Sequence, residues 1–234
     1  GLRSFNRSMP EEINRIVTDH LSALLFCSSQ TGVDQLGREG ISNNVFDVGD
    51  VMYDALLAFS RRENQMPQDA DLPAGDFYLL TVHRPSNTDN PENLQAIFSA
   101  LSAVNAQFVW PVHPRTKKAL AEHSIHRPVN LVLTNPFSYF EMLEALKRCK
   151  KVLTDSGGVQ KEAYWMKKPC ITLREETEWV ETLENDWNIL AGPNTKKILD
   201  ALNAPVDAGT WKHLYGNGHA SEKIAEIILK NLYP

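Results

Sequence analysis

The sequence predicts an α/β protein built on a parallel sheet with helices on both faces. From residue 77 onward, short apolar runs alternate with amphipathic segments of helical period. The apolar runs are continuous, which is typical of strands buried on both faces of a sheet. The stretch from Lys150 to Leu173 passes from an apolar run through Thr-Asp-Ser-Gly-Gly into a helix and then a second apolar run. That order is typical of a strand, a tight turn, a helix and a parallel strand.

The elements follow in a regular order. Before residue 64 we expect a helix from about residue 13, an apolar run ending at Cys27, a capped helix within 28–41 and a strand–helix pair within 44–63. Residues 64–76 are polar, contain two prolines and a glycine, and form the best linker candidate. Beyond it we predict strands at 77–83, 107–113, 129–135, 151–154 and 170–173, and helices at 91–104, 114–123, 138–149, 194–203 and 220–233, with a further helix after the Ser-Gly-Gly turn.

Composition excludes several classes of protein. The 234 residues carry a net charge of −5, which argues against a nucleic-acid partner because phosphate backbones require a basic face. No apolar run reaches about 18 residues, so we expect no membrane span and a cytoplasmic protein. The three cysteines are an odd number without metal-ligand spacing. We therefore expect reduced, mostly buried thiols and no metal site.

Polar and charged side chains follow the predicted strands where a ligand would bind. In open parallel sheets, ligands bind beyond the carboxyl ends of the strands. A sheet does not need such residues there for its stability, so we interpret them as a site. The residues in question are His83, Arg84, His113, Arg115, Asn135, Asp155, Ser156 and Arg174-Glu175-Glu176.

The turn Ser156-Gly157-Gly158 is a candidate phosphate site. A helix N-terminus leaves backbone N–H groups unpaired and carries a partial positive charge. Glycines let a phosphate approach the backbone, and the Ser156 hydroxyl can donate one more hydrogen bond. The alternative is an ordinary N-cap formed by Asp155 or Ser156, with the glycines serving the turn. The motif is neither a Walker loop nor a dinucleotide fingerprint.

Other candidate residues have equally plain structural interpretations. Glu162 lies one helical turn after Gly158, where it could accept two ribose hydroxyls or be a solvated helix residue. His83 can transfer a proton near neutral pH or stabilise a leaving phosphate, and Arg84 can pair with phosphate.

His113 and Arg115 could line the same cleft or cap the next helix. Gly216 and Gly218 before the last helix indicate a second anion site or a flexible turn. Glu11 and Glu12 suit the first turn of a helix. From the residues alone, the sequence indicates only a parallel α/β protein that binds a nucleotide or another phosphorylated ligand.

A series of motifs resembles the non-hydrolysing UDP-N-acetylglucosamine 2-epimerases. They are GLRSFNRSMPEEINR, TDH, TVHRPSN, PVHPRT, LTDSGGVQKEA, KPCITLREETEW and YGNGHAS, which occur in the family's order from the first residue to the last helix. The resemblance implies a glycosyltransferase-B-type fold of two Rossmann-like domains. It also implies interconversion of UDP-GlcNAc and UDP-ManNAc, without an external cofactor, by elimination and re-addition of UDP.

The resemblance assigns roles to matching positions. Ser156, Gly157 and Gly158 would hold the diphosphate, Glu162 the ribose, and His83 would be the catalytic histidine at the leaving group. Glu11, the first acid of MPEE, would be the carboxylate near the sugar. Arg84, His113 and Arg115 are expected among the UDP-binding residues, and Arg3 and Gly218 are possible cleft residues. Three stretches depart from relatives: HRPSN replaces HRRE, Trp179 replaces an arginine, and NPFSYFEML differs from the pattern at the uracil side.

The family pattern begins with a Rossmann-like domain that this chain lacks. We therefore expect residues 1–55 to be a remnant of the N-terminal domain, 56–218 the C-terminal UDP-binding domain, and 219–234 a C-terminal helix. Such a chain would bind UDP but turn over poorly alone, and a homodimer is implied. The alternatives are a hydrolysing or uronic-acid UDP-sugar 2-epimerase, or a non-catalytic UDP-sugar binding domain. A glycosyltransferase is disfavoured, because the marked acids suit proton transfer and no acceptor site is visible.

Overall fold

The computed structural model describes residues 1–61, 72–122 and 125–232. The chain divides into two compact units: a central unit, Glu63–Trp211, and a terminal unit, which joins Gly1–Arg62 to Lys212–Pro234. Most of the predicted linker, 64–76, lies outside the described residues. The domain boundaries predicted after residues 55 and 218 stay a prediction.

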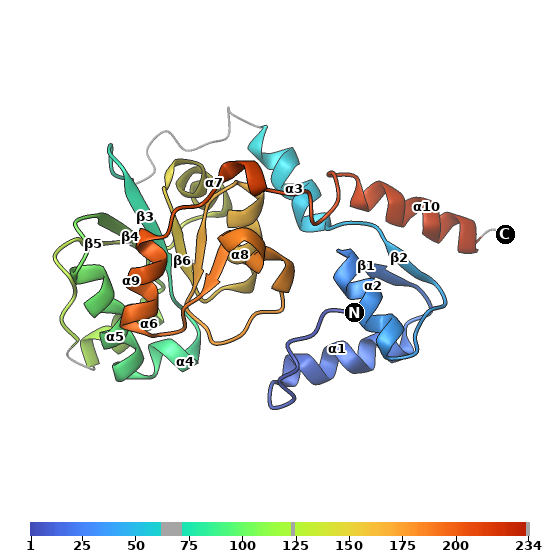
Figure 1. Cartoon of the computed structure of the whole chain (residues 1–234), viewed down its shortest axis with the longest axis horizontal. Helices are drawn as coiled ribbons and strands as arrows, with labels where there is room; N and C mark the ends of the chain where they lie inside the picture. The colour runs from blue at the N-terminus through green and yellow to red at the C-terminus, as the bar shows by residue number, and fades with distance from the viewer. Residues whose placement is uncertain (62–71, 123–124, 233–234) are drawn as a thin grey trace. The chain divides into compact units, whose positions relative to one another are not determined.

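The central unit is built on one parallel sheet (Figure 1). Within the described residues its six strands lie in the order β5-β4-β3-β6-β7-β8, and each neighbouring pair is parallel. The strands are β3 (Phe77–Thr81), β4 (Gln107–Pro111), β5 (Leu131–Thr134), β6 (Val152–Thr154), β7 (Cys170–Thr172) and β8 (Asn188–Leu190). The helices are α4 (Pro85–Thr88), α5 (Pro91–Ser102), α6 (Pro114–Glu122), α7 (Tyr139–Arg148), α8 (Gly157–Trp165) and α9 (Thr195–Asn203), with 3-10 helices at Val180–Asp186 and Ala208–Thr210.

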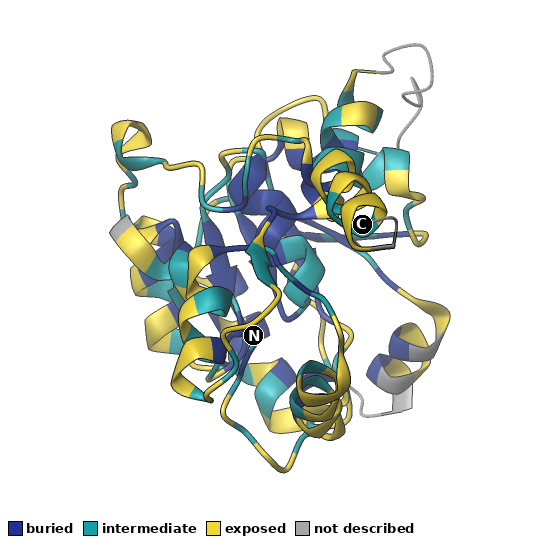
Figure 2. Cartoon of the chain, turned by 90° about the vertical axis from the view of Figure 1, so that its right-hand side faces the viewer, coloured by how far each residue is buried: buried dark blue, intermediate teal, exposed yellow. Residues whose placement is uncertain are grey.

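Helices cover both faces of this sheet. On one face, alternate strand residues such as Leu80 and Trp110 pack against α5 and α9. On the other face, neighbours such as Leu79 and Val109 pack against α7 and α8. Strand residues are therefore buried from both sides, as the burial colouring of Figure 2 shows. The predicted Rossmann-like parallel sheet is confirmed.

The elements differ from the predictions mainly at their ends. β3 and β4 each end two residues earlier than predicted, so His83 and His113 lie in the segments that follow them. The sequence did not predict α4 or β8, which are only four and three residues long. The three cysteines are free and buried, as expected.

The terminal unit contains a smaller parallel pair of strands. β1 (Leu25–Cys27) pairs with β2 (Val45–Asp47), and the helices are α1 (Pro10–Leu21), α2 (Gln30–Arg38), α3 (Val51–Ser60) and α10 (Ala220–Leu232). Its apolar core around the strands consists of Leu25, Cys27 and Leu36, with three partly buried neighbours. This core is much smaller than either core of the central unit.

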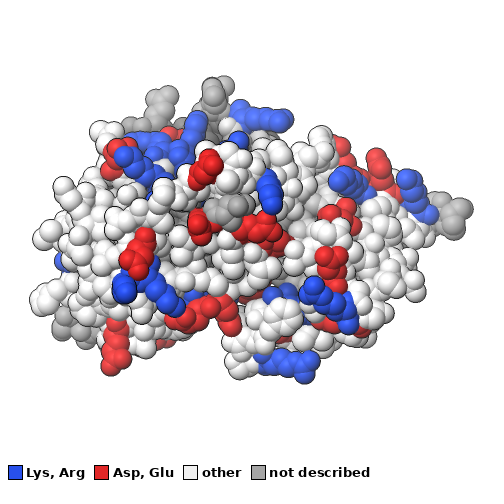
Figure 3. Space-filling view, viewed as in Figure 1, with Lys and Arg blue, Asp and Glu red and all other residues white. Residues whose placement is uncertain are grey.

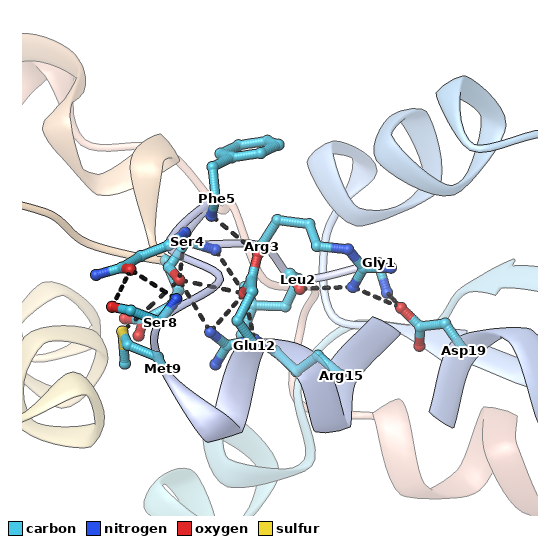
Figure 4. A network of polar contacts seen from close by, with 12 residues as sticks. Gly1, Leu2, Arg3, Ser4, Phe5, Ser8, Met9, Glu12, Arg15 and Asp19 are labelled. Carbon is cyan, nitrogen blue, oxygen red and sulfur yellow. Dashed lines mark hydrogen bonds and ion pairs between the residues drawn. The ribbon is translucent and has the colours of Figure 1, made fainter. Parts of the chain in front are cut away.

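Polar contacts replace apolar ones near the start of the chain (Figure 4). The buried Glu12 carboxylate accepts hydrogen bonds from the backbone N–H groups of Ser4 and Phe5, at 3.0 and 2.9 Å, and pairs with Arg15 at 2.7 Å. The Arg3 guanidinium, also buried, pairs with Glu39 at 2.8 Å and with Asp19 at 2.7 Å. These contacts fix the loop before α1 onto the helix.

Charged groups of both signs are interspersed on the face seen in Figure 3. In the described part of the chain, no helix has the length and apolar character needed to cross a membrane.

Candidate functional site

The site begins where two neighbouring strands end side by side. β3 and β6 are paired so that Thr81 lies opposite Thr154, and their hydroxyl oxygens are 2.5 Å apart. His83 follows one strand and Asp155 follows the other. The parallel register therefore brings together two residues that are 72 positions apart in the sequence.

Asp155 is fully buried and accepts hydrogen bonds from the segment after β3. The backbone N–H groups of His83 and Arg84 donate to its carboxylate at 3.1 and 3.0 Å, and the Asn87 side chain donates at 3.0 Å. His83 Nδ1 lies 3.2 Å from Asp155 Oδ1. Asn87 also donates to the carbonyl of Leu173, after β7, so the ends of three strands are joined.

Ser156 forms the N-cap of α8, which bears out the structural interpretation of that residue. Its hydroxyl accepts a hydrogen bond from Val159 N–H at 3.5 Å, and its own hydrogen can still be donated to a ligand. Gly157 and Gly158 occupy the first helical positions, where N–H groups have no partner within the helix. A cap and an anion site are thus compatible at this turn.

A pocket of about 190 Å³ opens at the same edge of the sheet. His83, His113 and Ser156 are among its lining residues, together with apolar side chains that include Phe137 and Met142. Three of the predicted site residues are therefore brought together. Small-molecule sites usually enclose 300 Å³ or more, so this pocket has room for only part of a nucleotide sugar.

Glu162 lies further along α8 and is largely buried, with 7% of its surface exposed. Burial raises the pKa of its carboxyl above the ordinary value, although a hydrogen bond from Tyr139 and the charge of Lys161 act in the opposite direction. Burial and the nearby Glu162 carboxylate raise the pKa of Tyr139 to about 12. Glu162 is therefore not a solvated helix residue, and its contact with α7 was not predicted.

A buried ion pair stands beside the first turn of α8. Arg174, after β7, donates to Glu178 through both terminal nitrogens at 3.0 and 3.1 Å. Glu178 Oε2 is 3.9 Å, and Trp179 Nε1 3.2 Å, from where a Cβ at Gly157 would lie. A side chain at Gly157 would therefore press against this segment. The sequence carried no signal for this pair, because Arg174 and Glu178 lie in a non-helical segment, where a spacing of four does not bring side chains together.

The remaining predicted residues lie elsewhere or are not described in full. The Arg84 side chain is half-buried, and that of Arg115 is outside the described part of the structure. Glu11, Arg3 and Gly218 belong to the terminal unit, and Glu11 is exposed. Arg3 is occupied by its two carboxylate partners.

Gly218 and the turn before α10 have a structural explanation. Gly218 has a φ of +87°, and a Cβ there would meet Leu57 at 2.4 Å. Asp54 of α3 accepts hydrogen bonds from Ala220 N–H at 3.1 Å and from Ser221 N–H at 2.7 Å. The N-terminus of α10, a candidate second anion site, is thus capped by a carboxylate of the protein.

Comparisons with known proteins agree with one another. The family model for UDP-N-acetylglucosamine 2-epimerase matches residues 1–229. A UDP-N-acetylglucosamine 2-epimerase homolog of Methanococcus maripaludis is 45% identical, over 99% of this chain and 67% of the relative. A UDP-2,3-diacetamido-2,3-dideoxy-D-glucuronate 2-epimerase of Pseudomonas aeruginosa is 41% identical, over 98% and 66%.

A solved structure shows the same likeness. The UDP-GlcNAc 2-epimerase of Methanocaldococcus jannaschii, in complex with UDP-GlcNAc and UDP, superposes with a TM-score of 0.87 at 39% identity, over 98% of this chain and 67% of that one. The chain thus spans about two thirds of the length of these relatives. The match along nearly the whole sequence shows that the chain belongs to the UDP-N-acetylglucosamine 2-epimerase family, a family of isomerases.

Proposed function

We propose that this protein is a UDP-sugar 2-epimerase that interconverts UDP-GlcNAc and UDP-ManNAc, and that its central unit binds the UDP group. The observation that carries the proposal is the convergence of His83, Ser156 and the N-terminus of α8 at one edge of the sheet, in a chain of this family. The solved relative from Methanocaldococcus jannaschii holds UDP-GlcNAc and UDP, which supports the ligand class.

Each part of UDP has a chemical counterpart at this edge. The diphosphate would accept hydrogen bonds from Gly157 N–H, Gly158 N–H and the Ser156 hydroxyl, and would be favoured by the positive end of α8. The ribose hydroxyls would donate to the Glu162 carboxylate. The base would lie against the apolar lining near Phe137.

The chemical step requires more than binding. Eliminating UDP needs a group that removes the C2 proton and cations or donors that stabilise the departing diphosphate. We propose His83 for the leaving group, with Arg84, His113 and Arg115 as further phosphate-binding residues. Glu11 is kept as the carboxylate that acts on the sugar, on the resemblance of its motif.

The first experiment is a calorimetric titration of the chain with UDP. We expect Glu162→Ala to weaken binding roughly 10- to 100-fold, the range for hydrogen bonds to a charged group. Asp200→Ala, an exposed change on α9, is the control and should bind like the wild type. Equal binding by the Glu162→Ala and wild-type chains would place UDP elsewhere.

The substrate has a second candidate. The relative from Pseudomonas aeruginosa acts, by its name, on a diacetamido uronic acid and is nearly as similar as the first. Parallel assays with UDP-GlcNAc and the uronic-acid nucleotide would separate the two. Free ManNAc as the product would instead indicate a hydrolysing enzyme, and UDP binding without proton exchange at C2 a non-catalytic domain.

Two expectations about the protein's setting remain part of the proposal. The three free, buried cysteines support a cytoplasmic protein, since disulfides are rare there. A homodimer follows from the resemblance and is checked by light scattering.

A further inference from the structure

The carboxylate of Asp155 is the most constrained charged group at the proposed site. It has no exposed surface, and both of its oxygens accept hydrogen bonds from the segment that carries His83. The peptide N–H and the ring of His83 face the same carboxylate, since Nδ1 lies 3.2 Å from Oδ1. The imidazole is thereby held at two points, whereas more than half of its side-chain surface remains exposed, at 56%.

We propose that Asp155 is a positioning residue for His83: it holds a proton on Nδ1, directs Nε2 to the ligand, and makes the ring a cation toward the diphosphate instead of a base toward the sugar. This inference rests on the proposed function and assigns the chemical state of one of its residues. Asp155 itself would touch neither substrate nor product.

The charges around the pair favour the ionised form of both groups. Burial opposes ionisation of Asp155, but hydrogen bonds from His83, Asn87 and Arg84 N–H outweigh it and hold its pKa below the ordinary value. The hydrogen bond to Asp155 raises the pKa of His83, against the opposing effects of burial and of the Arg84 charge. Among the described residues, His113 also lines this pocket, and the positive end of α8 lies at the same edge.

The inference fits the direction of electron flow in the proposed reaction. A base removes the C2 proton, its C–H electron pair forms the C1=C2 bond, and the C1–O pair leaves with UDP. Negative charge develops on the diphosphate oxygen, and a protonated Nε2–H of His83 can donate to it there. In the reverse direction the same proton is available again, so no further reactant is needed.

A simpler interpretation makes Asp155 only a structural link between strand ends. Three of its donors, His83 N–H, Arg84 N–H and Asn87 Nδ2, would serve that purpose without the ring. The two interpretations differ in the state of the imidazole, which can be observed directly and without turnover.

Nitrogen NMR of the 234-residue chain labelled at histidine is the test. The His83 resonances are assigned by their loss in His83→Gln. In the wild type we expect a neutral ring protonated at Nδ1 and a titration midpoint above about 6.5, the ordinary histidine value. Asp155→Asn should lower that midpoint, whereas Asn87→Ala, which removes a donor to the same carboxylate without touching the ring, should change it less.

The outcomes separate the inference from the proposed function. The inference would be overturned if the neutral wild-type ring is protonated at Nε2, or if Asp155→Asn leaves the titration midpoint of His83 unchanged. The wild-type measurement remains a test even if the variant fails to fold. UDP affinity should fall about tenfold as pH rises through the His83 midpoint, and His83→Gln should remove that dependence. Absence of UDP binding would defeat the proposed function and leave the ring's measured state unaffected.

Discussion

Glu162 is a residue whose position favours binding at the expense of stability. Its carboxyl is buried on α8, and burial raises its pKa above the ordinary value of 4.5. A carboxyl whose pKa is raised in the folded state does not reduce the free energy of unfolding at pH values below its unfolded-state pKa. The reduction grows as pH rises toward the folded-state pKa and is complete above it. Buried groups that a ligand will use commonly carry such a penalty.

We therefore predict that Glu162→Gln folds more stably than the wild type at pH 7 and binds UDP more weakly, roughly 10- to 100-fold. The gain in the free energy of unfolding should be smaller at pH 4, where the wild-type carboxyl is mostly protonated in both states. Urea unfolding at the two pH values, followed by tryptophan fluorescence, measures it. A gain of equal size at both pH values would contradict the stated cause.

Tyr139 supports the same carboxylate from α7. Its hydroxyl stays protonated throughout the working range, because its pKa is raised to about 12, and it can donate to Glu162. Tyr139→Phe should raise the pKa of Glu162 further and weaken UDP binding about tenfold at pH 6, with a smaller loss at pH 8. Calorimetric titrations at the two pH values test this, and Tyr78→Phe, on β3, is the control. A loss independent of pH would point to packing instead.

Some site residues could be predicted from the sequence because they directly follow apolar runs, whereas others depend on contacts between distant elements. His83 and Ser156 follow apolar runs directly, so their place at the strand ends could be read from the pattern. Asp155 was predicted to lie at a strand end and to be a possible helix cap, but its hydrogen-bond partners were not predicted, because they depend on the register of β3 against β6. Tyr139 was not predicted as a partner of Glu162, since their contact depends on how α7 and α8 pack.

At the scale of elements, a carboxylate of α3 binds the start of α10. Asp54 accepts two backbone N–H groups and the Ser221 hydroxyl at the start of α10. Burial opposes its ionisation, but these hydrogen bonds outweigh it and lower the pKa of Asp54. Because its folded-state pKa is depressed, the contribution to stability is present above its ordinary value of 3.8 and is lost as pH falls through the folded-state value.

Asp54→Ala should destabilise the terminal unit by about 1–2 kcal/mol at pH 7, the usual cost of losing an N-cap, and the difference from the wild type should shrink as pH falls below 3.8. Hydrogen exchange should show faster opening of α10, with β3 and β6 unchanged. Glu226→Ala, an exposed change on α10, serves as the control. Unchanged exchange in α10 would mean that apolar packing alone holds the helix.

Short elements were the least predictable part of the fold. The alternation of strands and longer helices follows from apolar runs and period, and it was predicted to within two or three residues at most ends. β8 and α4 have three and four residues, too few to show a period, and depend on contacts with the rest of the sheet. The glycines before α10 indicated a turn, but the sequence could not show that Asp54 would supply its anion.

At the scale of the whole molecule, the two units depend on different forces. The central unit has large apolar cores on both faces of its sheet. Among its described residues the terminal unit has fewer buried apolar side chains than the central unit, and ion pairs add to its stability. Hydrogen bonds from Arg3 lower the pKa of Glu39 to about 2. This depressed pKa contributes stability that is present above 4.5 and is lost as pH falls toward 2.

Acid should therefore unfold the terminal unit first, and two optical signals can separate the units. The five tryptophans, Trp110, Trp165, Trp179, Trp187 and Trp211, all belong to the central unit. Between pH 4.5 and 2 we expect far-ultraviolet circular dichroism to lose the helical signal of α1, α2, α3 and α10 before tryptophan emission shifts. Glu39→Gln should lower the free energy of unfolding by about 2 kcal/mol at pH 7. This is below the 3–5 kcal/mol for a broken buried pair, because Arg3 still pairs with Asp19. The difference from the wild type should shrink as pH falls below 4.5. Glu92→Gln, an exposed change on α5, is the control and should be as stable as the wild type. If circular dichroism and tryptophan emission change at the same pH, the two units unfold as one.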